Sequence, residues 1–204
     1  MIFVQHRVNN IEALAVVNSS LGVEIDLRES NGEIILSHDP FNTGPRLNDW
    51  LMCYSGKLLI LNIKEMGIEK HVVEIIRNQG AIDYVLLDLA FPYLRRAIKS
   101  DFTVAARVSE FESLDEAINT GAKWLWLDSF TGDWSYLKRV VERKKSYDFR
   151  TCLVSPELQE RSIGNGVAEF EFLVKLIQSN EGVFDAICTK SKDTWEKGFK
   201  IHAE

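Results

Sequence analysis

The sequence has 204 residues, of which 46% are hydrophobic and 26% are charged, a composition typical of a folded globular domain. This balance excludes a chain that is mainly disordered, and no run approaches the ~20 apolar residues that cross a bilayer. Lysine and arginine number 24 against 30 acidic residues, so the formal net charge is −6. That sign argues against nucleic acid as a partner, because such binding depends largely on neutralising phosphates.

The first residues, MIFVQHRVNN, contain only a short apolar run and lack the apolar core of a signal peptide. The cysteines, Cys53, Cys152 and Cys188, are odd in number and widely spaced, which fits neither a disulfide framework nor a zinc motif. We therefore expect buried, reduced thiols in a cytoplasmic protein. No linker or low-complexity tract divides the chain, so we expect one domain over residues 1–204.

Short β-branched or apolar runs alternate with helical segments along the chain. The expected strands, in chain order, are residues 2–5, 22–27, 58–63, 84–87, 103–107, 124–127, 151–154 and 186–189. The expected helices between them are residues 10–19, 46–54, 68–78, 92–99, 113–120, 135–145 and 167–178. After the second strand, Asn31-Gly32 is a tight-turn dipeptide and residues 33–37 form a short returning strand.

Repeated βα units predict an α/β protein with a parallel sheet. Eight such units with right-handed crossovers close most economically into a compact (β/α)8 TIM barrel, here with a short β-hairpin after the second strand. An open doubly wound sheet is the alternative.

Polar residues gather at the carboxyl ends of the expected strands, where a barrel of this kind places its active site. In chain order they are His6, Arg7, Glu24, Asp26, His38, Asp39, Asn62, Lys64, Glu65, Asp88, Arg107, Asp128, Glu157 and Lys190. The last five have a simple alternative role as ion-pairing rim residues, and we do not assign them to catalysis. In the loop after residues 124–127, Phe130 and Trp134 are further candidates for ligand contact.

Residues two apart on a strand point to the same face, so Glu24 and Asp26 form one pair and Asn62 and Lys64 another. Two carboxylates with a neighbouring amide supply the oxygen ligands that a hard divalent cation prefers. We therefore expect Mg²⁺ or Ca²⁺ rather than zinc at Glu24, Asp26 and Asn62.

Two histidines at the same end of the expected barrel, His6 and His38, can serve as a general acid and a general base near neutral pH. The cationic side chains of Arg7 and Lys64 can hold an anion. A divalent cation, two cationic side chains and an acid–base pair together indicate phosphoryl chemistry.

The run HRVNNIEALAVVNSSLGVEIDLRESNGEIILSHDP resembles the opening of the glycerophosphodiester phosphodiesterases, within the superfamily that includes phosphatidylinositol-specific phospholipase C. A His-Arg pair, a Glu-x-Asp pair and a His-Asp pair follow in the family's order, and KLLILNIK resembles its third strand. The resemblance covers about the first 65 residues in detail and the rest only in architecture.

The resemblance implies a short, divergent, metal-dependent phosphodiesterase of lipid metabolism. It implies His6 and His38 as the catalytic acid–base pair and Glu24 and Asp26 as ligands of the cation. Arg7 and Lys64 would bind the substrate phosphate. The attacking group is water or a neighbouring hydroxyl of the substrate, so hydrolysis and release of a cyclic phosphate both stay open.

Asn62 departs from the family pattern, in which the third strand reads Glu-x-Lys. Fewer acidic ligands weaken cation binding, although an amide oxygen is a competent ligand. The alternative function is therefore a catalytically inactive relative that binds a phosphorylated ligand or a partner protein.

The expected substrate is a small soluble glycerol- or sugar-linked phosphodiester. We expect no membrane partner, because the sequence shows no apolar loop and no basic amphipathic helix. The sequence does not indicate an oligomeric state.

Overall fold

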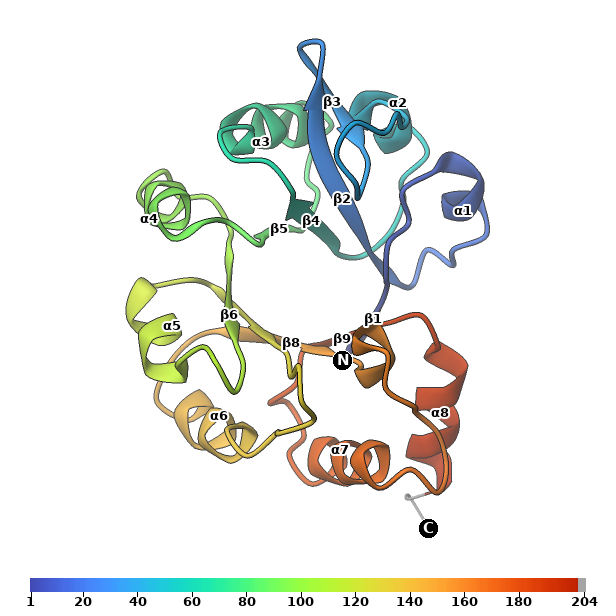
Figure 1. The fold of residues 1–204 in the computed structure, drawn as a ribbon, viewed down its shortest axis with the longest axis vertical. Helices are drawn as coiled ribbons and strands as arrows, with labels where there is room; N and C mark the ends of the chain where they lie inside the picture. Colours follow the sequence, from blue (N-terminus) through green and yellow to red (C-terminus); the bar gives the residue numbers. More distant parts are fainter. Residues whose placement is uncertain (202–204) are drawn as a thin grey trace. The chain divides into compact units, whose positions relative to one another are not determined.

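The computed structural model describes residues 1–201. Contacts within the chain group it into two compact units, one of residues Ile2–Ala106 and one of Arg107–Glu204 with Met1. Figure 1 labels the elements of both units. Each unit is described by itself, and the expectation of one domain over residues 1–204 stays a prediction.

The Ile2–Ala106 unit alternates strands and helices and contains the hairpin. Its strands are β1 (Ile2–Gln5), β2 (Gly22–Ser30), β3 (Glu33–Leu36), β4 (Leu59–Ile63) and β5 (Tyr84–Leu87). Its helices are α1 (Ile11–Ala15), α2 (Leu47–Leu51), α3 (Glu69–Asn78) and α4 (Phe91–Lys99).

Strand β6 (Ala105–Val108) runs from the first unit into the second, which again alternates strands and helices. The elements that follow are α5 (Leu114–Thr120), β7 (Trp124–Leu127), α6 (Leu137–Lys144), β8 (Arg150–Val154), the 3-10 helix η1 (Pro156–Gln159), α7 (Ala168–Gln178), β9 (Ala186–Thr189) and α8 (Lys192–Ile201). The protein has the predicted (β/α)8 TIM-barrel fold rather than a doubly wound sheet.

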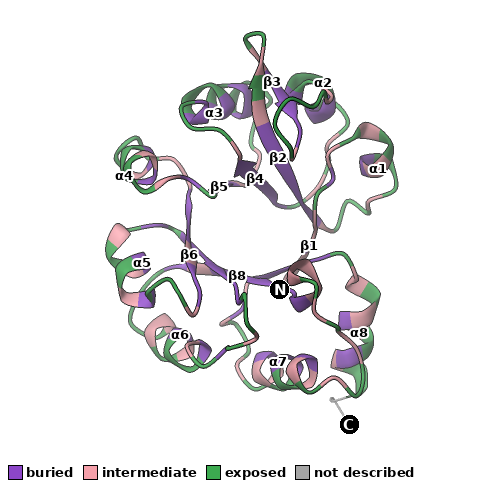
Figure 2. Cartoon of the chain, in the orientation of Figure 1, coloured by how far each residue is buried: buried purple, intermediate pink, exposed green. Residues whose placement is uncertain are grey.

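The first unit's sheet has the strand order β5-β4-β2-β1, and the neighbouring strands run parallel. The register between β2 and β4 pairs Val23 with Leu59 and Asp26 with Asn62. Figure 2 shows β4 and most of β2 buried, with exposed residues on the helices and loops. Because parallel neighbours end at the same edge, the polar residues that close these strands are brought together.

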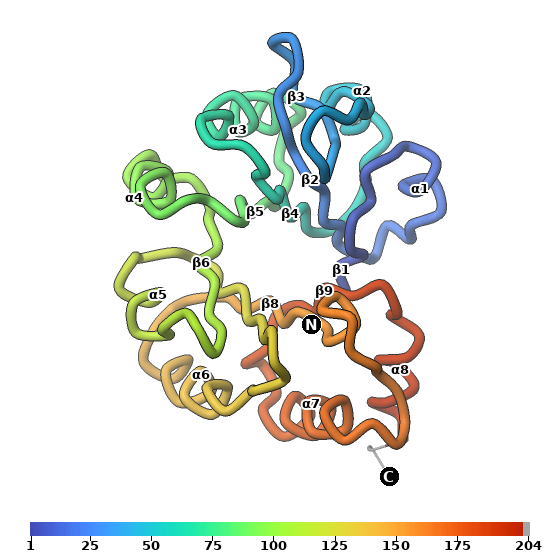
Figure 3. Tube along the Cα trace, in the orientation of Figure 1, coloured from blue at the N-terminus to red at the C-terminus, as the bar shows by residue number. Residues whose placement is uncertain are grey.

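The predicted hairpin is present, and it makes β2 longer than expected. Strand β3 pairs antiparallel with β2, from Ser30 opposite Glu33 to Leu27 opposite Leu36. Asn31 and Gly32 both have positive φ, 53° and 83°, as a two-residue hairpin turn requires. Figure 3 shows this hairpin extending past α2 and α3. The amide of Ser37 then donates to the Asp26 carbonyl at 3.0 Å, which returns the chain to the strand ends.

Three helices differ clearly from the sequence expectation, and one of them, α2, ends at Leu51 rather than at residue 54. Helix α1 spans Ile11–Ala15 only, because Val16 is 85% exposed and the next residues add no buried turn. Helix α8 was not among the expected helices, and it packs through the fully buried Trp195. Helix α5 is capped at both ends: Ser113 accepts from the Glu116 amide at its start, and Gly121 ends the helix at φ 83°.

The cysteines are all free thiols, as expected, but burial was predicted wrongly for one of them. Cys152 and Cys188 lie on buried strands, whereas Cys53 follows α2 in an exposed position. Within residues 1–201, none of the helices combines the length and the apolar character needed to cross a membrane.

Candidate active site

The carboxyl end of β1 turns sharply onto β2 through Arg7. This residue has a φ of 56°, in the left-handed region that is costly for a side chain other than glycine. The turn aims its amide at Glu24, and the N–H donates to Oε2 at 2.7 Å. The His6 imidazole lies on the same carboxylate, with Nε2 3.8 Å from Oε2. Backbone strain at a strand end is a recurrent feature of functional sites.

Glu24 and Asp26 form the predicted carboxylate pair on β2. Both residues are 1% exposed, so two acidic groups are held out of water side by side. From β4, Asn62 donates its Nδ2 to Glu24 Oε1 at 2.9 Å. The other amide atom, Asn62 Oδ1, is buried and has no hydrogen-bond partner among the described residues.

Positive charge reaches the carboxylate pair from two sides. Lys64 Nζ lies 3.2 Å from Asp26 Oδ1, and Arg7 Nε lies 3.5 Å from Oδ2. Lys64 also approaches Asp88 Oδ2, at 4.0 Å. Asp88 follows β5 and has a φ of 61°, so it is a second strained residue at these strand ends. Arg7 and Lys64 therefore place two positive charges beside the carboxylate pair.

His38 follows β3 and is held differently from His6. Its Nδ1 lies 2.7 Å from Asp39 Oδ1, and 37% of its side chain is exposed. This hydrogen bond lowers the pKa of the Asp39 carboxyl below its usual range, so Asp39 stays ionised and orients the imidazole. No ion pair or hydrogen bond within residues 1–201 joins the His38 ring to the Glu24–Asp26 pair.

Two residues that the sequence analysis did not select hold this site together. Asn9 clamps Asp26: its Nδ2 donates to Oδ2 at 2.7 Å, and its Oδ1 accepts the Asp26 amide at 2.9 Å. Arg28 lies two residues beyond Asp26 and donates Nε and Nη2 to the His38 carbonyl, at 3.2 and 3.0 Å. Its Nη1 donates to the Lys64 carbonyl at 3.3 Å. Arg28 therefore ties the backbone of His38 to that of Lys64.

The buried position raises the pKa of Glu24 to about 7. Loss of hydration is the largest cause, and the neighbouring Asp26 charge adds to it. Hydrogen bonds from Asn62 and Arg7 and the charge of Lys64 act in the opposite direction but do not cancel it. The positive charge near Glu24 and Asp26 is therefore too small to keep both carboxyl groups fully ionised near neutral pH.

This shift predicts a pH-dependent stability. Because the folded pKa of about 7 lies above the ordinary 4.5, Glu24 favours folding when protonated. Its contribution, on the order of 3 kcal/mol at most, is complete below pH 4.5 and is lost as pH rises through about 7. In Glu24→Gln the side chain stays neutral, so the free energy of unfolding should not show this decrease as the pH rises. Urea unfolding in chelator between pH 5 and 8 measures it.

The matched control is Glu12→Gln, on the exposed first turn of α1. This variant should keep the wild-type slope of unfolding free energy against pH. Equal slopes in wild type and Glu24→Gln would show that Glu24 is ionised throughout this range and would overturn the assignment.

The donor set at this point fits a hard divalent cation. Its groups are oxygens only, namely two carboxylates and the unpartnered Asn62 Oδ1. The charge shortage at Glu24 is one that a bound cation would relieve. The part of the chain that the structure describes contains no cluster of three or more His, Cys, Asp or Glu side chains suited to a metal ion. A cation bound at the two carboxylates would have the Asn62 amide oxygen as its third ligand.

The strand-end residues of the Arg107–Glu204 unit are engaged with one another. Arg107 Nη1 donates to Asp128 Oδ2 at 2.6 Å, and Gln159 Nε2 donates to the same carboxylate. Glu157 accepts from the Lys190 amide at 3.0 Å. These contacts agree with the ion-pairing alternative given above.

The two aromatic candidates in this unit differ in exposure. Trp134 is 4% exposed and donates its Nε1 to Glu169, so it is a packing residue rather than a free ligand contact. Phe130 is 45% exposed and stays a candidate.

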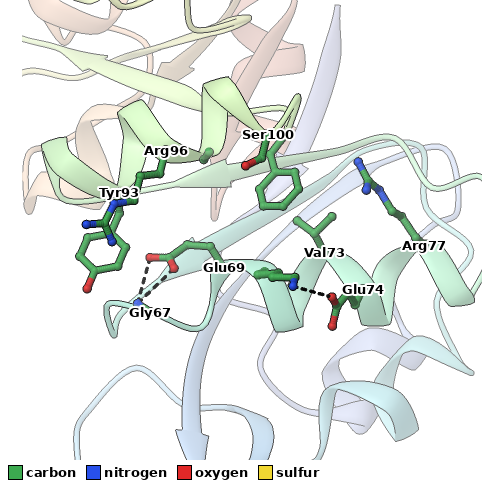
Figure 4. A pocket seen from close by; sticks show the side chains of 11 residues that line it. Gly67, Glu69, Val73, Glu74, Arg77, Tyr93, Arg96 and Ser100 are labelled. Carbon is green, nitrogen blue, oxygen red and sulfur yellow. Dashed lines mark hydrogen bonds and ion pairs between the residues drawn. The ribbon is translucent and has the colours of Figure 1, made fainter.

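A separate groove of about 560 Å³ lies between α3 and α4. Figure 4 shows its lining: the Glu69 carboxylate accepts from the Gly67 amide at 3.1 Å, and the Arg96 guanidinium lies over the Tyr93 ring. Arg77 packs over Phe102 in the same way. The lining includes no histidine and none of the predicted site residues, so this groove is not the predicted site.

Comparisons with known proteins support the fold. No family model matches the chain, and no curated protein matches it by sequence. Among solved structures, a phosphodiesterase from Oleispira antarctica in complex with the product sn-glycerol-3-phosphate is similar at TM-score 0.71 and 16% identity, covering 98% of this chain and 97% of that one.

Two further structures agree. A glycerophosphoryl diester phosphodiesterase from Parabacteroides distasonis has TM-score 0.68 and 13% identity, over 98% of this chain and 86% of that one. A glycerophosphodiester phosphodiesterase from Agrobacterium tumefaciens has TM-score 0.64 and 14% identity, over 97% and 99%. The chain therefore has the (β/α)8 fold of the glycerophosphodiester phosphodiesterases, along nearly its whole length.

Proposed function

We propose that this protein is a divalent-cation-dependent phosphodiesterase that hydrolyses a glycerol- or sugar-linked phosphodiester. The observation that carries the proposal is the buried Glu24–Asp26 pair, bordered by Arg7, Lys64 and His6 at one edge of the sheet. The fold shared with the solved phosphodiesterases supports it.

In this proposal Arg7 and Lys64 bind the non-bridging oxygens of the phosphodiester. Both cations already lie beside Asp26, so they are positioned before the substrate arrives. They neutralise the negative charge that grows on phosphorus-bound oxygens during the attack.

His6 and His38 exchange the protons of the reaction. One imidazole removes a proton from the attacking hydroxyl, and the other gives a proton to the oxygen of the departing alcohol. Asp39 orients His38 for this role through its 2.7 Å hydrogen bond. Attack by water on phosphorus breaks one P–O bond and gives an alcohol and a phosphomonoester.

Glu24, Asp26 and Asn62 Oδ1 would hold the divalent cation. When bound, Mg²⁺ or Ca²⁺ supplies charge neutralisation and Lewis acidity to the phosphoryl group. Asn9 keeps Asp26 oriented for this purpose through its paired hydrogen bonds.

The test is release of alcohol and phosphomonoester from a panel of glycerophosphodiesters and sugar-linked diesters. Parallel assays contain EDTA, Mg²⁺ or Ca²⁺. We expect turnover with a divalent cation and none in EDTA, and loss of that turnover in Lys64→Met. Silence across the panel, with cation or phosphate binding retained in calorimetry, would instead favour the non-catalytic relative that the amide at Asn62 suggests.

Arg28 gives a prediction for this function. Arg28→Gln should lower kcat by roughly 10- to 100-fold, because His38 and Lys64 are no longer fixed relative to each other. Arg28→Lys should recover only part of kcat, since one ammonium cannot replace a guanidinium that bonds two carbonyls. Steady-state kinetics at several pH values measures both.

Arg46→Gln is the matched control for Arg28. Arg46 also contacts the hairpin, through an exposed ion pair with Glu33 at 3.8 Å, but touches no site residue. Its kcat should stay within about twofold of wild type. Equal losses in Arg28→Gln and Arg46→Gln would point to general weakening of the hairpin instead.

A further inference from the structure

Exposed apolar side chains stand at the carboxyl ends of the strands in the Ile2–Ala106 unit. Phe41, Met66 and Phe91 are 104%, 64% and 66% exposed. We call these three residues the apolar rim. They follow β3, β4 and β5 respectively, and β2, β4 and β5 are neighbours in one sheet. The rim therefore lies on the edge of the sheet that carries the candidate site.

Each rim residue follows a residue of that site by two or three positions. Phe41 follows His38, Met66 follows Lys64, and Phe91 follows Asp88. Phe41 also has a φ of 67°, so its loop turns the ring outward at some conformational cost. Large apolar groups left in water beside a polar site mark a surface that meets an apolar part of a ligand or partner.

The Arg107–Glu204 unit also carries exposed aromatic side chains just after its strands. Phe111 follows β6 and Phe130 follows β7, and these residues are 73% and 45% exposed. Their rings lie 6.2 Å apart between centroids, with the Arg107 guanidinium 5.7 Å from the Phe130 centroid. Exposed aromatic residues thus accompany polar strand ends in both units.

The charges between the rim residues favour one kind of ligand. Asp39, with 67% of its side chain exposed, precedes Phe41 by two residues, and Asp88, with 27% exposed, precedes Phe91 by three. The whole chain carries a net charge of −6. A strongly anionic lipid surface would be repelled, whereas a zwitterionic head group with a cationic end meets carboxylates.

We propose that the substrate is a phosphodiester amphiphile with a single alkyl or acyl chain and a zwitterionic head group. This inference rests on the proposed function. The phosphate binds between Arg7 and Lys64, and the apolar chain lies on Phe41, Met66 and Phe91. One molecule can carry both parts, because each rim residue follows a residue of the candidate site by only two or three positions along the chain.

This surface was not predicted from the sequence, from which we expected a small soluble diester. Rim residues stand singly in the sequence, each among polar neighbours, and only the parallel strands bring them to one edge. An isolated exposed apolar residue is ordinary and carries no information until its neighbours in space are known.

The catalytic test compares glycerophosphocholine with its monoacyl derivative. Wild-type kcat/KM should be at least tenfold higher for the acylated diester. In the triple variant Phe41→Ser, Met66→Ser, Phe91→Ser, this ratio should fall to within about twofold of one. The control Val16→Ser, Met52→Ser removes two side chains that are 85% and 73% exposed at the opposite strand edge, and should keep the wild-type ratio.

The binding test does not depend on turnover. Calorimetry of the His6→Ala protein with monomeric dodecylphosphocholine, below its micelle concentration, should show binding that is at least fivefold weaker after the rim substitutions. If neither diester is hydrolysed but this rim-dependent binding is found, the proposed function fails and the amphiphile is not a substrate, whereas the assignment of the apolar rim to a single-chain zwitterionic amphiphile stands for a bound ligand.

Three results would overturn the inference while leaving the proposed function intact. The first is equal kcat/KM for the two diesters in wild type, and the second is an unchanged ratio in the triple variant. The third is a molar mass in light scattering that rises with protein concentration in wild type and not in the rim variant, together with no preference of wild type for the acylated diester. That result would assign the apolar rim to a second copy of the chain.

Discussion

Replacing His6 with alanine should lower phosphodiester turnover by roughly 10²- to 10⁴-fold, the range for loss of a general acid or base. His6 has 14% of its side chain exposed, and its Nε2 lies 3.8 Å from Oε2 of the buried Glu24 carboxylate. It is close enough to the charged groups to act where the phosphate binds, yet open enough to exchange its proton. Cation binding should be retained, because His6 is not among the proposed oxygen ligands.

His38 is the second member of the proposed acid–base pair, and its replacement tests that role separately. His38→Ala should also lower kcat by roughly 10²-fold or more, and Asp39→Asn by less, because Asp39 acts only through the imidazole. A pH–rate profile should lose one limb in each histidine variant.

His71→Ala is the control for both histidine variants, since His71 is exposed on α3. Its turnover and pH–rate profile should match wild type. Normal turnover in both His6→Ala and His38→Ala would remove the acid–base assignment altogether.

The fold was predictable because its signals are local and repeated. Eight apolar runs separated by helical periodicity need no long-range information, and six of these eight predicted strands begin and end within one residue of the observed ones. Where a boundary failed, tertiary contacts decided it. Strand β2 is extended to Ser30 by pairing with β3, and α1 stops at Ala15 because no surface is available to bury Val16.

The site was predictable where strand geometry alone fixes it. Period-two alternation put Glu24 with Asp26 and Asn62 with Lys64, and the hydrogen bond from Asn62 to Glu24 and the ion pair of Lys64 with Asp26 connect the two pairs. Asn9 and Arg28 were missed because their partners are a side chain and carbonyls on other segments. A backbone carbonyl leaves no mark in the sequence, so such a contact can be found only after folding.

Asn62 determines how far this site depends on a bound cation. The amide occupies the position where the resemblance implies a third acid: its Nδ2 donates to Glu24, and its Oδ1 has no hydrogen-bond partner among residues 1–201. Asn62→Glu adds a third buried negative charge beside Glu24, whose pKa is already raised to about 7. Without cation, the free energy of unfolding should fall on the order of 3 kcal/mol.

A divalent cation should reverse this loss, because three carboxylates bind it more tightly than two with an amide. At a concentration about 100-fold above Kd, the cation should add roughly 2.7 kcal/mol to the unfolding free energy of Asn62→Glu. Asn62→Gln is the matched control: it has the same length without the charge, and should show neither the loss in EDTA nor the larger recovery. Thermal unfolding in EDTA, Mg²⁺ and Ca²⁺ measures all three proteins.

If Asn62→Glu is no more cation-dependent than Asn62→Gln, the oxygen cluster at Glu24, Asp26 and position 62 is not the cation site, and the charge on the phosphate must be balanced by Arg7 and Lys64 alone.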